Sequence, residues 1–198
     1  MSPTEFELIF VTPEVSGPGD TRIAAVEQLL DIVVESHSGL TLATVTAEGD
    51  DAVTAALDAA AVLSSCGLTV VRSYPDLVTR QDIADRADVS RQAVGNWVRG
   101  DRMQSDPFPA PVNLVGGGAW LWGDVVAWLR RQNYEIDDIE FPSMDDHARI
   151  DAALVGAPKR TPKITGHLEA KVGFAPSVVG SSRDWAGDSF QSSYALAV

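Results

Sequence analysis

The middle of the chain carries a row of polar side chains whose types suit the reading of nucleic-acid bases. If residues 91–99 form a helix, about 100° per residue places six positions on one face: Ser90, Arg91, Gln92, Gly95, Asn96 and Arg99. Arg can form two hydrogen bonds with guanine, and Gln and Asn can do the same with adenine. None of the six positions is acidic, although the chain carries a net charge of −13. The pattern therefore predicts a surface that contacts DNA.

Further polar residues complete this predicted surface. Ser90 and the amino end of its helix can hold a phosphate. Glycine inside a helix costs about 1 kcal/mol relative to alanine, so Gly95 either lets the backbone approach a base or sugar closely or is a neutral substitution. Thr79 and Arg80 lie at the start of the preceding helix, where we expect DNA contacts too. The candidate phosphate contacts are Arg102, Arg130 and Arg131, for which ordinary solvated charge is the alternative.

Two short helices are predicted to position these groups, over 80–87 and 91–99. Thr79 and Ser90 are suitable caps for them, and Asp88 and Val89 form the tight turn between them. The expected shared core consists of Ile83, Ala84, Ala87, Val89, Val94, Trp97 and Val98. This arrangement resembles the helix-turn-helix pattern, with Asp88 in place of the usual turn glycine.

The residues that follow extend the resemblance. A rigid connector (108–111, FPAP) precedes an expected strand at 112–115, a glycine turn at 116–118, a return strand at 119–122 and a helix at 125–131. Over residues 77–131 the chain is similar to the winged DNA-binding domain of MerR, excisionase and AlpA-type proteins. The turn lacks the arginine often found at the tip of the wing. We expect the tryptophans here to pack: Trp97, Trp120, Trp122 and Trp128.

The amino-terminal third alternates strand and helix signals. Strands are expected at 6–11, 33–35, 40–45 and 68–73, and helices at 21–31 and 52–65, the second capped by Asp50 or Asp51 and stopped by Gly67. This βαββαβ order suggests a ferredoxin-like sandwich. We expect it to serve dimerisation, and ligand sensing stays open as the alternative. A similar sandwich precedes this domain in uncharacterised actinobacterial helix-turn-helix proteins.

The carboxyl-terminal part changes in composition. An acidic stretch leads into a short helix over 146–155, with Ile150, Leu154 and Val155 as its apolar stripe, and a largely flexible tail follows. The predicted class is thus α+β, with four segments: 1–75 (sandwich), 76–132 (winged helix-turn-helix), 133–155 (acidic linker and short helix) and 156–198 (tail).

Charge and composition limit the functional classes. The acid is concentrated outside the central segment: residues 1–78 have a net charge of −10, 79–132 of +1 and 133–198 of −4. No apolar run is long enough to span a bilayer, and the amino terminus does not read as a secretory signal. Cys66 is the only cysteine, so we expect no internal disulfide, no multi-cysteine metal site and a cytoplasmic protein.

An enzyme is not expected. His37, His147 and His167 lie far apart, and the chain has no HExxH spacing, phosphate-binding glycine loop or nucleophile elbow. No cofactor or metal is predicted.

We therefore expect sequence-specific binding of double-stranded DNA through the major groove, as a transcriptional regulator. Because one such unit buries little surface, we expect a homodimer. An excisionase-like architectural factor, acting through a protein partner on its acidic parts or its tail, is the alternative.

Overall fold

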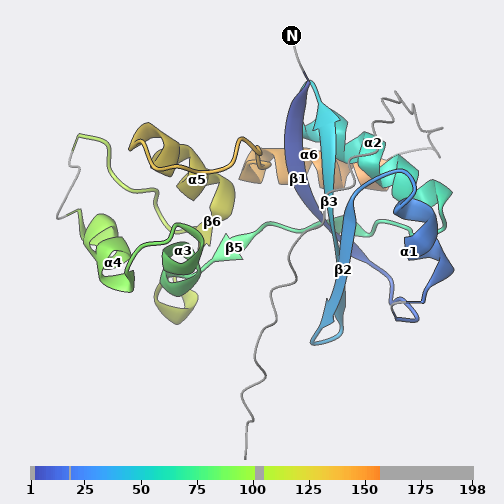
Figure 1. Ribbon diagram of the computed structural model, residues 1–198, viewed down its shortest axis with the longest axis horizontal. Helices are drawn as coiled ribbons and strands as arrows, with labels where there is room; N and C mark the ends of the chain where they lie inside the picture. Colours follow the sequence, from blue (N-terminus) through green and yellow to red (C-terminus); the bar gives the residue numbers. More distant parts are fainter. Residues whose placement is uncertain (1–2, 18, 101–104, 157–198) are drawn as a thin grey trace, which may run out of the picture. The chain divides into compact units, whose positions relative to one another are not determined.

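A four-stranded antiparallel sheet and six α-helices give the described part of the chain a mixed α+β structure (Figure 1). The computed structural model describes residues 3–17, 19–100 and 105–156. The predicted tail lies outside these ranges, apart from its first residue, and so does Arg102. The expectation of an α+β protein is confirmed for the described residues.

The sheet has the strand order β2-β3-β1-β4. Its long pair is β1 (Thr4–Thr12) with β3 (Leu40–Gly49), and β2 (Ile32–His37) joins β3 through a tight turn. In that turn Ser38 and Gly39 both have positive φ. The fourth strand, β4 (Arg72–Ser73), is shorter than the predicted 68–73, because only these two residues pair with the edge of β1.

Helices α1 (Thr21–Val26) and α2 (Ala52–Ser65) follow β1 and β3. The prediction for α2 is confirmed at both ends, since Asp51 accepts a hydrogen bond from the backbone N–H of Thr54 at 2.8 Å. This bond lowers the pKa of Asp51. The prediction for α1 was too long by five residues, because the chain leaves the helix after Val26 and enters β2 at Ile32.

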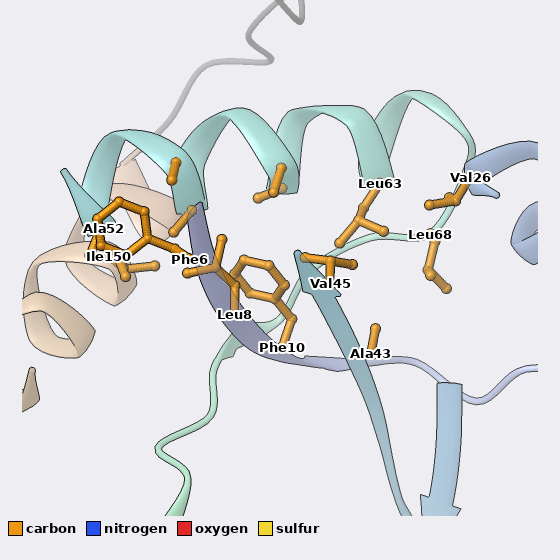
Figure 2. Packing of buried hydrophobic residues seen from close by; sticks show 14 residues of the cluster. Phe6, Leu8, Phe10, Val26, Ala43, Val45, Ala52, Leu63, Leu68 and Ile150 are labelled. Atoms are coloured by element: carbon orange, nitrogen blue, oxygen red, sulfur yellow. The ribbon is translucent and has the colours of Figure 1, made fainter. Parts of the chain in front are cut away.

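The first core lies between the sheet and α2 (Figure 2). Alternation along β1 points Phe6, Leu8 and Phe10 toward the helix, where they are buried. Leu63 of α2 belongs to the same buried cluster, and alanines on the same helix face allow close approach. Burial stabilises the fold by about 1.5–3 kcal/mol for each large apolar side chain.

Helix α6 (Met144–Gly156) contributes to this first core through Ile150, which is 1% exposed. Leu154 is partly buried against the same core, but the prediction that Val155 belongs to the apolar stripe is wrong, since it is 90% exposed. The buried polar face of α6 was missed: Asp151 accepts hydrogen bonds from both the N–H and the hydroxyl of Ser73, at 2.6 and 2.9 Å. These bonds attach α6 to β4.

A second core is built from short elements. These are β5 (Leu77–Val78), α3 (Arg80–Arg86), α4 (Arg91–Arg99), β6 (Trp120–Leu121) and α5 (Trp122–Arg131). An exposed 3-10 turn (Val115–Gly117) precedes β6 and contributes no residue to this core. The expectation that the tryptophans pack is confirmed, because the four that were named are each at most 6% exposed: Trp97, Trp120, Trp122 and Trp128.

The predicted strands 112–115 and 119–122 do not form a regular hairpin, and only one antiparallel bridge joins them. β6 pairs with β5, with Val78 opposite Trp120, while the 112–119 loop closes on itself through a single bridge between Asn113 and Ala119. Three successive glycines with positive φ, Gly116 to Gly118, form the turn of this loop. Trp122, expected at a strand end, is the first residue of α5.

Candidate nucleic-acid interface

The turn between α3 and α4 fixes the direction of the second helix. α3 begins with a capping box, in which Thr79 and Asp82 each bond the other's backbone N–H. The bonds that the Asp82 carboxylate accepts, from the backbone N–H and then from the hydroxyl of Thr79, lower its pKa. After α3, Asp88 adopts a positive φ of 50°, and the N–H of Val89 donates to the carbonyl of Ala84 at 2.9 Å. This is the geometry of a Schellman motif, with aspartate in the place that glycine usually takes.

The buried face of α4 is held by aromatic rings. Trp97 lies 5.1 Å from Trp128 and 6.0 Å from Phe108, measured between ring centroids. The indole N–H groups of Trp120 and Trp128 each donate to a backbone carbonyl at 2.9 Å, so their burial leaves no donor unpaired. A rigid inner face leaves the opposite side of α4 fixed toward solvent.

The amino end of α4 presents the predicted polar groups. The Ser90 hydroxyl caps the helix by accepting from the N–H of Ala93 at 3.2 Å. Arg91 and Gln92 are exposed, and neither has a hydrogen-bond or ion-pair partner among the residues that the structure describes. α4 contains no acidic residue. Its first turn therefore offers one guanidinium and one amide to a ligand.

In the second half of the same helix, Asn96 and Arg99 contact each other, and Gly95 differs from the prediction. The amide oxygen of Asn96 accepts a hydrogen bond from the Arg99 guanidinium, so these two side chains act as a pair. Gly95 was predicted to be exposed, and this is wrong, because it is buried. A side-chain carbon there would lie 3.3 Å from the Arg99 guanidinium, which folds over it. Gly95 thus makes room for Arg99 and is not itself a contact surface.

The other candidate arginines are held within the chain. Arg131 forms an ion pair with Asp106 at 3.0 Å, and its hydrogen bonds to that carboxylate lower the pKa of Asp106, although desolvation acts in the opposite direction. Arg130 pairs with Glu140 and donates to the carbonyl of Ile139 at 2.8 Å. Arg80 lies over the Trp120 ring, with its guanidinium carbon 5.7 Å from the centroid.

These contacts assign Arg130 and Arg131 a structural role that the sequence did not reveal. Arg131 and Asp106 are 25 positions apart, so no helical or strand spacing connects them. Arg86, which was not among the candidates, pairs with Asp76 and is likewise a structural cation. Of the predicted site residues within the described ranges, α4 brings together Ser90, Arg91, Gln92, Asn96 and Arg99.

The 112–119 loop is apolar and uncharged. Leu114 and Val115 are 80% and 78% exposed, and the Asn113 side chain accepts from the N–H of Val115 at 2.8 Å. No charged side chain occurs between Asp106 and Asp124. The loop therefore offers apolar groups and backbone, and no cation, to a neighbouring molecule.

Two other kinds of site are not found in the described ranges. No described helix combines the length and the apolar character that crossing a membrane requires. No cluster of three or more histidine, cysteine or acidic side chains suited to a metal ion occurs among the same residues.

No protein-family model, curated protein or solved structure that was compared with the chain matches it.

Proposed function

We propose that this chain binds double-stranded DNA with sequence specificity, by inserting α4 into the major groove, and that it acts as a transcriptional regulator. The observation that carries the proposal is the first turn of α4, where Arg91 and Gln92 are exposed and have no partner among the described residues. They lie on a helix without acid, held by a tight turn to the helix before it. Both features are expected of a recognition helix.

The proposal includes the fold of both parts. The order βαββαβ, with β1 and β3 paired side by side and β2 and β4 at the edges, supports a ferredoxin-like sandwich. Helices α3 and α4, the loop at 112–119 and α5 support a winged helix-turn-helix in which the wing is reduced to an apolar loop. We propose a homodimer through the sandwich, because a single recognition helix buries too little surface for tight binding.

The test begins with the selection of bound fragments from the source genome by the purified chain. Affinities of the variants Arg91→Ala and Gln92→Ala for the selected site are then measured. Each should bind more weakly by about 1–3 kcal/mol and lose preference at one base pair. Gln81→Ala is the matched control, because Gln81 is an exposed residue of α3 that bonds Asp85. If both α4 variants bind like the control, the assignment of α4 is wrong.

The dimer has its own test. The molar mass in solution should correspond to two chains, and the selected site should contain two copies of a half-site. A monomeric mass at micromolar concentration, together with tight binding to a single half-site, would exclude the dimer.

A second function, architectural bending of DNA, is favoured by one observation. The exposed Leu114 and Val115 resemble the apolar wedges that enter the minor groove and open a base step. A gel-shift series with circularly permuted fragments measures the bend. The double variant Leu114→Ser, Val115→Ser should reduce the bend angle if the loop is a wedge. An unchanged bend, or no bend with the unmodified chain, favours simple regulation.

A further inference from the structure

A cavity of about 580 Å³ lies on the outer face of the four-stranded sheet. Its sheet wall includes a cross-strand row in which Thr44 pairs with Ile9 on one side and Val33 on the other. These residues alternate with the core-facing ones of Figure 2, so they occupy the face that α2 does not cover. The volume is within the range of about 300–1,000 Å³ found for small-molecule sites.

The second wall comes from the helix-turn-helix part and from the segment that follows α5. It includes Asp76, Arg86 of α3 and Trp122 of α5. Backbone hydrogen bonds connect this wall to β1, because Glu7 donates to the carbonyl of Glu140 at 3.0 Å and Glu140 donates to that of Glu5 at 2.9 Å. All lining residues belong to one compact unit, residues 1–164.

The charge of the lining is strongly negative. Five carboxylates face one cation, Arg86, which already forms an ion pair with Asp76. The side chains of the other four carboxylates have no hydrogen-bond or ion-pair partner within the described ranges: Glu7, Glu35, Glu135 and Asp137. An anionic ligand would be repelled, and a cation would relieve the repulsion among these groups.

The carboxylate of Glu7 is the most desolvated of the four. It is half-buried, and burial, followed by the nearby charge of Asp76, raises its pKa, while Arg86 acts in the opposite direction. A cation beside a partly desolvated carboxylate interacts more strongly than it does in water.

The remaining lining is apolar and aromatic. Ile9, Val33, Ile136 and Ile139 contribute aliphatic surface, and Trp122 packs edge to face against Phe141 with 6.5 Å between ring centroids. Val33 is 62% exposed, so its aliphatic side chain is accessible in the cavity wall. The cavity thus combines an apolar wall with unpaired negative charge.

We propose that this cavity binds a small organic cation with a compact apolar body, such as a protonated amine on an alicyclic or aromatic skeleton. The ammonium lies among Glu7, Glu135 and Asp137, and the apolar body lies against Ile9, Val33 and Ile139. This binding is separate from the proposed DNA contact, because no α4 residue lines the cavity.

The test uses the full chain and three probes with the same body and different charge: adamantane-1-amine, 1-adamantanol and adamantane-1-carboxylate. Calorimetry should show that the amine binds at least about tenfold more tightly than the alcohol, with the carboxylate weakest. Equal affinity for amine and alcohol, or no binding of the amine at roughly millimolar concentration, would overturn the proposal.

Variants locate the site. Val33→Lys places a competing ammonium at an exposed position that tolerates it, and should abolish binding of the amine. Glu7→Gln should weaken it, while Glu48→Gln, an exposed β3 residue outside the cavity, should leave it unchanged. Amine binding that survives Val33→Lys would overturn the assignment. So would a tetralysine peptide that displaces the amine and binds more tightly, since this would point to a protein partner.

Discussion

The guanidinium of Arg86 lies over the ring of Trp122, with its carbon 5.0 Å from the ring centroid. The same guanidinium pairs with Asp76. Arg86 ends α3 and Trp122 begins α5, so the stacked pair connects α3 to another helix of the second core.

Replacing Arg86 by methionine tests this connection. Arg86→Met keeps an unbranched side chain but removes both the ion pair and the contact between cation and ring, so the free energy of unfolding should fall by about 1–2 kcal/mol. Urea unfolding measures it. Arg149→Met is the control, since Arg149 is more exposed and its ion pair within the described ranges is with Asp146 on its own helix. Equal losses in the two variants would mean that stacking on Trp122 contributes nothing.

The glycine turn contains a matched pair of positions. Gly117 and Gly118 both have positive φ, but an added side-chain carbon would meet open space at Gly117 and the Trp120 ring at Gly118. Gly118→Ala should therefore cost about 2–4 kcal/mol, and Gly117→Ala about 1–2 kcal/mol. Thermal unfolding compares them. Equal unfolding temperatures for the two variants would contradict the close contact between Gly118 and the Trp120 ring.

Asp88 provides a substitution that should stabilise the chain. Its φ of 50° is costly for a residue with a side chain and free for glycine, so Asp88→Gly should raise the free energy of unfolding by about 0.5–1 kcal/mol. Asp88→Ala lacks both the freedom of glycine and a polar side chain, and should not stabilise. Denaturant midpoints distinguish the three proteins, and a destabilised glycine variant would contradict the described turn.

His147 should make stability depend on pH. Its ring is 6% exposed, with Nδ1 3.1 Å from the Ser73 hydroxyl, and burial lowers its pKa despite the nearby charges of Asp151 and Asp146. The unfolded chain therefore takes up a proton at a higher pH than the folded chain does. The free energy of unfolding should fall as the pH drops from about 6.5 toward the lower folded pKa.

Urea midpoints at a pH above and a pH below that window measure the dependence on His147. His147→Gln should flatten the change, whereas His37→Gln, at an exposed position of β2, should retain it. An unchanged pH dependence in His147→Gln would show that other groups cause it.

Local signals determined which elements could be predicted from the sequence. The bounds of α2 and α4 follow from Asp51 and Ser90, whose side chains cap the first turn a few residues away. The tryptophans were predicted to pack because large aromatic area is costly to expose.

Pairing across long separations could not be predicted. β5 and β6 meet across more than forty positions, and their strands are two residues long, too short for any alternation to appear. The ion pairs of Arg86, Arg130 and Arg131 join residues 10 to 25 positions apart, which no helix or strand spacing predicts, so these arginines could not be recognised as paired from the sequence. The exposed state of Arg91 and Gln92 was predictable, because helical spacing alone determines which face they share.

The internal pairing of Arg86, Arg130 and Arg131 has a consequence for how such a protein would move through a genome. Affinity for random-sequence DNA comes from cations that displace counterions at phosphates. The guanidiniums of Arg86, Arg130 and Arg131 already form ion pairs with carboxylates of their own chain. If the chain binds DNA as proposed, these three guanidiniums would contribute little to its affinity for random-sequence sites. The difference in residence time between a target and a random site would then come mainly from the base contacts of α4.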